Sequence, residues 1–152
     1  MRITASDLDQ LRRRRAAGTL VRQPHLATPV GVVLFIPGAL TNPLNASGWT
    51  WRKRANWTTV WHEKTADALL ESGYRPGLWS PAAPKRITFT AHIRRKFDSQ
   101  DNLRACLKPV VDALQKCGVI HADDDASGHQ FVYPDQCLNR SWRGVEVRIE
   151  LL

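Results

Sequence analysis

The stretch from Phe97 to Asp125 reads FDSQDNLRACLKPVVDALQKCGVIHADDD, and the spacing of its apolar residues predicts the central helix of the fold. Five of them recur at i, i+4, i+7, i+8 and i+11, which is the spacing of one apolar helical stripe; they are Leu103, Leu107, Val110, Val111 and Leu114. The same geometry aligns Asp101, Lys108 and Asp112 on the opposite face, because seven and eleven residues are close to whole numbers of turns. One face is therefore expected to pack on a core, and the other to present two acids and a base.

Pro109 leaves two interpretations of this helix open. An interior proline removes a backbone hydrogen bond and costs about 3 kcal/mol, so the helix either kinks near Ala105 or starts again at Pro109. The apolar stripe continues on both sides of the proline, which favours the kink.

Carboxylates gather at both ends of the stretch. Asp98 and Asp101 open it, and Asp123, Asp124 and Asp125 close it, although the whole chain holds only 14 acidic residues at a net charge of +8. Such clustering indicates a site for a hard divalent cation, which takes oxygen ligands and in phosphoryl chemistry is commonly held by carboxylates and substrate phosphate. The alternative is a helix cap followed by a solvated acidic turn. A helix of about 17 residues spans about 25 Å, so the sheet would have to bring the second group back toward the first.

The flanking sequence predicts an α+β (mixed α/β) fold with a single small sheet of about four strands and two main helices packed on it. The second helix is expected from Trp49 to Ser72, with Gly73 as its stop. The expected strands are a continuous apolar run, two alternating segments and one short segment; they are Val30–Ile36, Arg86–Arg95, Gly144–Leu151 and His129–Tyr133.

The chain divides into an N-terminal basic arm and linker at residues 1–28 and one folded domain at residues 29–152. In the arm, Ser6 can cap a short helix that carries Arg12–Arg15 in its last turn and stops at Gly18. A membrane span needs about 20 apolar residues, and no apolar run approaches this length. The N-terminus lacks the apolar core of a signal peptide. Three cysteines without a CxxC pair are typical of reduced thiols, so we expect a cytoplasmic protein.

The charge of the chain predicts a polyanionic partner, most commonly nucleic acid, because 22 Lys and Arg stand against 14 Asp and Glu. Two groups of cations are candidates for DNA contact: Arg52, Lys53 and Arg54 at the start of the helix expected from Trp49 to Ser72, and Arg94, Arg95 and Lys96 directly before Asp98. Tryptophans surround the first group, and basic residues among aromatics suit phosphate contact with base stacking. A helical tryptophan is more often a core residue, so we assign Trp49, Trp51 and Trp57 to packing.

The motif from Asp98 to Asp125 resembles that of the RusA family of Holliday junction resolvases, especially its phage-borne members. The matching residues are an acid pair ending in Asp-Asn, a helix with a lysine and Asp-Ala-Leu, a glycine and an Asp-Asp pair; here they are Asp98, Asp101-Asn102, Lys108, Asp112-Ala113-Leu114, Gly118 and Asp123-Asp124. The loop from Asn42 to Asn45 and the basic helix that follows are similar to the N-terminal part of that family. Residues 1–28 lie outside the resemblance.

The resemblance implies a homodimeric, metal-dependent endodeoxyribonuclease that cuts four-way DNA junctions in recombination and repair, in the cytoplasm of a bacterial or phage-infected cell. It implies Asp98, Asp101, Asp123 and Asp124 as metal ligands and Lys108 as the cation that stabilises charge on the phosphate. Asp98, Asp101, Lys108 and Asp124 are thus the expected catalytic residues, and Asn42 and Asn45 join the six cations as expected DNA contacts. Mg²⁺ is expected from all-oxygen ligands, with Mn²⁺ as a substitute, and no small-molecule cofactor is implied.

The sequence departs from the family pattern in its spacing, and other functions stay open. The acid pair is Asp98-Ser-Gln-Asp101 rather than Asp-x-Asp, and an extra residue leaves open which of Asp123, Asp124 and Asp125 is the ligand. One alternative is a structure-selective DNA-binding protein without catalysis, and another is a nuclease for flaps or single strands with the same acidic site. A third is a zinc-stabilised module; its candidate ligands are Cys117, His121, His129 and Cys137.

Overall fold

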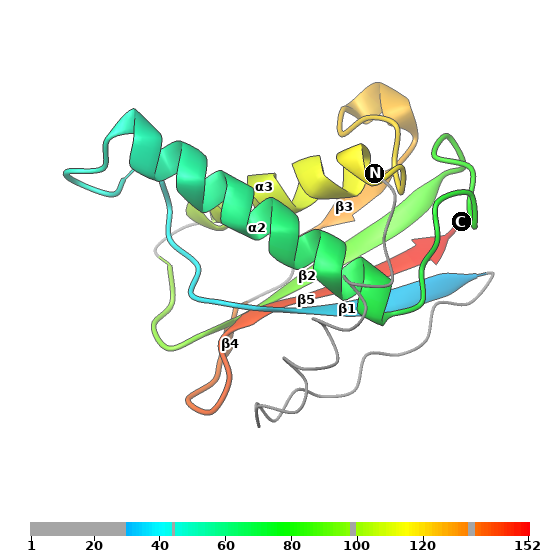
Figure 1. The fold of residues 1–152 in the computed structure, drawn as a ribbon. Helices are drawn as coiled ribbons and strands as arrows, with labels where there is room; N and C mark the ends of the chain where they lie inside the picture. Colours follow the sequence, from blue (N-terminus) through cyan, green and yellow to red (C-terminus); the bar gives the residue numbers. More distant parts are fainter. Residues whose placement is uncertain (1–29, 44, 98–99, 134–135) are drawn as a thin grey trace.

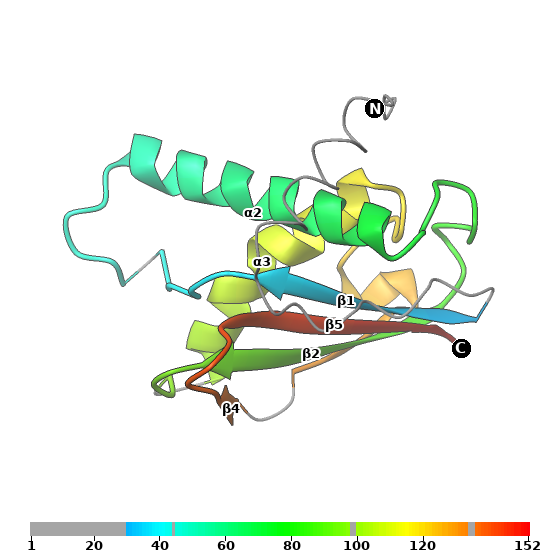
Figure 2. The same cartoon turned by 60° about the horizontal axis from the view of Figure 1, so that its bottom comes forward.

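Both long helices lie on the same face of one five-stranded mixed sheet, which gives the domain two layers (Figures 1 and 2). The computed structural model describes residues 30–43, 45–97, 100–133 and 136–152, and the side chains of Gln100 and Asp101 are outside this description. The predicted α+β class is therefore confirmed. The N-terminal arm, with its predicted helix, lies outside the described residues.

The last strand of the chain occupies the middle of the sheet. β5 (Gly144–Leu151) pairs antiparallel with β1 (Gly31–Pro37) on one side and with β2 (Lys85–Ile93) on the other. β3 (Gln130–Val132) and β4 (Cys137–Leu138) each pair in parallel with β2, at its beginning and at its end. The two-residue strand β4 was not predicted, because so short a segment carries no alternation that a sequence pattern can detect.

Helix α2 (Trp51–Glu71) follows the predicted range, with its first residue two positions later. Thr50 ends the preceding loop as the N-cap, and its hydroxyl oxygen accepts a hydrogen bond from the Lys53 backbone N–H at 3.3 Å. Gly73 follows the helix with a φ of 80°, a conformation that glycine adopts without steric cost. The helix packs through its second half, where the buried residues are Trp61, Thr65, Ala68 and Leu69.

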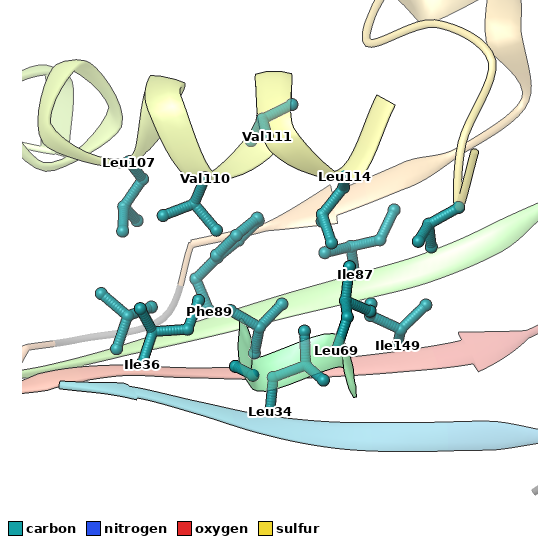
Figure 3. Packing of buried hydrophobic residues seen from close by; sticks show 14 of the residues in the cluster. Leu34, Ile36, Leu69, Ile87, Phe89, Leu107, Val110, Val111, Leu114 and Ile149 are labelled. Carbon is teal, nitrogen blue, oxygen red and sulfur yellow. The ribbon is translucent and has the colours of Figure 1, made fainter. Parts of the chain in front are cut away.

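Helix α3 (Gln100–Lys116) buries the predicted apolar stripe against the sheet. All five stripe residues are at most 2% exposed, and Figure 3 shows Leu107, Val110 and Leu114 above Phe89 and Ile87 of β2. Removing these side chains from water contributes to the packing free energy between the two layers. The helix continues through Pro109 as a single element, so the alternative of a second start at Pro109 is wrong.

The β2–α3–β3 unit determines where the acidic turn lies. Because β3 is parallel to β2 and adjacent to it, the chain must cross back along the length of α3 before β3 begins. A short 3₁₀ helix, η1 (Asp125–Ser127), lies in this connection.

No helix within the described ranges is long and apolar enough to span a membrane, and the cysteines Cys106, Cys117 and Cys137 are all free.

Candidate functional site

Lys108 joins the helix to the acidic turn. Its Nζ donates a hydrogen bond to Asp112 Oδ1 at 2.8 Å, one turn further along α3, and another to Asp123 Oδ2 from the turn after the helix. A metal site shared by the two acidic groups would need the second group to return toward Asp101. The structure brings Asp123 to the middle of α3, at Lys108, seven residues beyond Asp101, which corresponds to about 10 Å along the helix axis.

The two ion pairs fix the charge of the groups that form them. The hydrogen bond to Asp112, followed by that to Asp123, raises the pKa of Lys108, although partial burial opposes the shift. The hydrogen bond from Lys108 lowers the pKa of the Asp123 carboxyl. Both groups are thus charged over a wide range around neutral pH.

The structure describes the other predicted acidic residues to different extents. Asp98 lies outside the described residues, and Asp101 belongs to the first turn of α3 with its side chain undescribed. Asp124 is exposed, and its backbone carbonyl accepts a hydrogen bond from Ser127 Oγ at 2.6 Å, whereas its side chain makes no cap hydrogen bond to η1. Asp123 is therefore the member of the acidic run that lies against the helix.

A pocket of about 310 Å³ opens beside Lys108 and Asp123. Arg104 adds a second cation to its wall, one turn before Lys108 on α3, and its Cζ lies 5.0 Å from the centre of the Tyr133 ring. That ring stacks on buried Phe89, at 5.1 Å between centroids, which fixes the floor under Arg104. Arg104 was not predicted, although its i, i+4 spacing to Lys108 was a usable signal.

Carboxylate oxygens are the donors that Mg²⁺ prefers, so the chemistry of Asp123 and its acidic neighbours fits the predicted metal. Within the described part of the chain, no group of three or more His, Cys, Asp or Glu converges as a metal site. A complete ligand set would therefore need Asp98 or the side chain of Asp101. The metal site stays a prediction.

The loop after β1 is held to the start of α3 by asparagines. Asn42 Nδ2 and Asn45 Nδ2 both donate to Asn102 Oδ1, at 2.6 and 2.9 Å. Asn42 is only 8% exposed, so this contact fixes the loop beside the first turn of α3, next to Asp101 in the chain. DNA contact by Asn42 and Asn45 stays a prediction, and what the structure shows is their role in positioning the loop.

The predicted cations are all exposed, and they lie at one end of the molecule. The start of α2, the end of β2 and the start of α3 share this end in both views (Figures 1 and 2). A second pocket of about 310 Å³ is lined by Arg94, Arg95 and Lys96 after β2, and by Arg143 before β5. Arg143 was not predicted, because an isolated arginine in a loop gives no signal of its own.

The zinc alternative would bring two cysteines and two histidines together. The structure describes all four residues and pairs only the histidines, with His129 Nε2 at 3.2 Å from His121 Nδ1. Among the described residues, neither Cys117 nor Cys137 joins a metal-binding group with this pair. The zinc-stabilised module is therefore not assembled.

No protein-family model matches this chain, and no curated protein matches it either. The resemblance to RusA resolvases accordingly rests on the motif residues and their order along the chain.

Proposed function

We propose that this chain is a metal-dependent endodeoxyribonuclease of the RusA type, which hydrolyses phosphodiester bonds in four-way DNA junctions as a cytoplasmic homodimer. The observation that carries the proposal is the contact between Lys108 and Asp123. It unites the lysine and the second acidic group of the motif across 15 residues of sequence, which a solvated acidic turn would not require. The resemblance supplies the substrate class.

The proposed division of labour follows from the charges at the pocket. Asp98, Asp101, Asp123 and Asp124 are the residues that would hold Mg²⁺, and the bound ion would supply polarisation of the scissile phosphate and activation of water. Lys108, kept protonated by its two carboxylate partners, offers a fixed positive charge to a phosphate oxygen on which negative charge develops. Arg104, on the same wall, would orient the phosphate through its planar guanidinium.

The proposed DNA-binding end follows from the distribution of cations. Arg52, Lys53 and Arg54 project from α2, and Arg94, Arg95 and Lys96 project from the end of β2, so two arms of a branched substrate meet positive charge from two elements. The Asn102 contact connects this end to α3, which carries Lys108. This contact would thus fix the helix that carries the chemistry to the loop that precedes the DNA-binding cations of α2.

The test is cleavage of a labelled synthetic four-way junction beside duplex, flap and single-stranded controls, with Mg²⁺, with Mn²⁺ and with EDTA. Wild type is compared with Asp101→Asn and with Glu150→Gln, a matched change of an exposed carboxylate on β5. We expect paired, metal-dependent cuts in the junction that Asp101→Asn abolishes and Glu150→Gln retains. Junction binding without cutting under either metal would contradict the nuclease activity and leave a structure-selective DNA-binding protein. Cutting of flaps alone would show that the substrate is a flap and not a four-way junction.

A further inference from the structure

Trp51 is the most exposed of the large apolar side chains that the structure describes, with 73% of its surface accessible. The sequence pattern assigned it to packing, and this assignment is wrong, whereas the same assignment holds for Trp57, which is partly buried against the core. The difference is positional: the first six residues of α2 are all exposed, so this end of the helix extends beyond the core. An aromatic ring kept in water on a fixed element is a feature of binding surfaces rather than of packing.

The surroundings of Trp51 are cationic. The Arg52 guanidinium carbon lies 5.4 Å from the centre of its ring, and the exposed side chains of Lys53 and Arg54 follow. No Asp or Glu occurs in the sequence from Gly31 to His62, so no nearby carboxylate of this segment neutralises the patch. The surface therefore combines an aromatic face with positive charge that no carboxylate of this segment offsets.

Packed aromatic rings support the start of α2, where Trp51 lies. Trp49 packs edge-on against Trp57 with ring centroids 6.1 Å apart, and Trp57 lies 6.3 Å from the buried ring of Trp61. This aromatic series anchors the projecting part of α2 in the core. The exposed ring thus sits on a stiff support, which lowers the entropy lost when a ligand stacks on it.

We propose that Trp51 is a stacking platform for an unpaired nucleotide base, with Arg52, Lys53 and Arg54 holding the phosphates on either side. Every base has an apolar π-face, so an exposed aromatic among cations binds single strands without reading their sequence. Bases inside a duplex offer no such face, and the site would therefore favour the opened nucleotides at a branch point. The inference rests on the proposed function only in taking DNA as the partner.

Charge argues against the other occupants of this patch. A second copy that met this patch with its own identical patch, as in a two-fold contact, would bring cations to cations. The segment 1–29 holds six arginines against two aspartates, so it would be repelled as well. A nucleic acid satisfies the aromatic and the cationic part of the patch together.

The experiment compares the full-length wild type with Trp51→Ala, Trp51→Leu and Trp51→Tyr by fluorescence anisotropy in EDTA. The probes are a labelled short oligothymidylate and an abasic deoxyribose-phosphate chain of equal length and charge. We expect Ala and Leu to weaken oligothymidylate binding by about 5- to 150-fold, and Tyr to retain most of it, because only Tyr preserves a stacking ring. All four proteins should bind the abasic chain alike.

Equal oligothymidylate affinity of wild type and Trp51→Ala would overturn the inference, and so would a loss that the abasic chain shares. Retained affinity in Trp51→Leu would also overturn it, because a merely apolar contact needs no ring. If Trp51→Ala instead lowers the sedimentation coefficient and leaves binding unchanged, a second copy covers the patch. Junction cleavage measured in parallel separates the two proposals. A Trp51 effect on binding without any cleavage would contradict the proposed nuclease activity and leave the stacking site. Cleavage without a Trp51 effect on binding would contradict only the stacking site.

Discussion

At the scale of single residues, the ammonium group of Lys108 forms ion pairs with two carboxylates that belong to different elements, Asp112 of α3 and Asp123 of the turn after it. The side chains are 56%, 33% and 35% exposed, so water screens both pairs and their contribution to folding is small. An arrangement that adds little stability, yet fixes the charges of Lys108 and Asp123 at the wall of a pocket, is typical of a functional site.

Replacing Lys108 should therefore separate activity from stability. We expect Lys108→Met to slow junction cleavage about 10²- to 10³-fold, the usual effect of removing one electrostatic stabiliser. Its free energy of unfolding should change by less than about 1 kcal/mol, because the pairs are exposed. Single-turnover cleavage and urea unfolding measure the two effects. Lys116→Met, which removes an exposed lysine from the last turn of α3, is the matched control and should leave both unchanged.

The pKa of Asp123 gives a test that needs no DNA. Because Lys108 lowers this pKa in the folded state, the ion pair contributes stability above the ordinary pKa of aspartate and loses it as the pH falls through the lowered value. Titration of the Asp123 carboxyl carbon by NMR should show the lowered pKa in wild type and a return toward the ordinary range in Lys108→Met. An unchanged titration in the variant would mean that the pair does not form in solution.

At the scale of elements, α3 organises the domain because it serves the core and the site with opposite faces. Its apolar stripe packs on β2, and its polar face carries Asn102 near the start and Lys108 near the middle. Asn102 is the structural connection to the β1–α2 loop, since one acceptor atom receives two amide donors from that loop.

Removing that acceptor should loosen the loop. We expect Asn102→Ala to lower the free energy of unfolding by about 1–3 kcal/mol, because Asn42, which donates to it, is buried. Asn45→Ala removes the exposed donor of the same cluster and should cost less than about 1 kcal/mol, which makes it the control. Urea unfolding gives the free energies, and limited proteolysis of residues 38–50 reports on the loop. Equal stability of Asn102→Ala and wild type would contradict the structural role of this contact.

At the scale of the whole molecule, the excess of cations is not spread evenly over the described elements. The start of α2, the end of β2 and the loop before β5 bring basic side chains to one end, opposite the C-terminal end of α2 (Figures 1 and 2). A polyanion is therefore expected to bind there, and to bind less tightly as salt rises, since each phosphate contact releases counterions.

The salt dependence of binding identifies which cations touch phosphate. We expect Arg54→Gln to weaken junction binding and to reduce the slope of log K against log salt by about 1. Arg75→Gln, which removes an exposed arginine just beyond the other end of α2, should leave the slope unchanged. Anisotropy titrations in EDTA at several salt concentrations measure both. Equal slopes for the two variants would show that the DNA-binding surface does not include the start of α2.

Much of the fold follows from local patterns that need no tertiary information. The apolar stripe of α3 and the alternation in β2 and β5 each repeat with the period of their element, so position along the chain dictates which side chains are buried. The order of strands does not follow in this way. That β5 inserts between β1 and β2 depends on pairing across more than 50 residues, and no local signal encodes it.

The candidate site also has some features that follow from local sequence and others that depend on tertiary structure. The sequence by itself determined the acidic and basic residue types, the helical face that carries Lys108 and the excess of positive charge, because these depend on composition and on the geometry of one helix. Only the tertiary structure decided that Asp123 meets Lys108, that Arg104 and Arg143 line the pockets, and that Trp51 stays in water while Trp61 is buried. Those outcomes depend on where the β2–α3–β3 crossover returns the chain and on where the core ends beneath α2. Both are properties of the packed layers rather than of any one stretch of sequence.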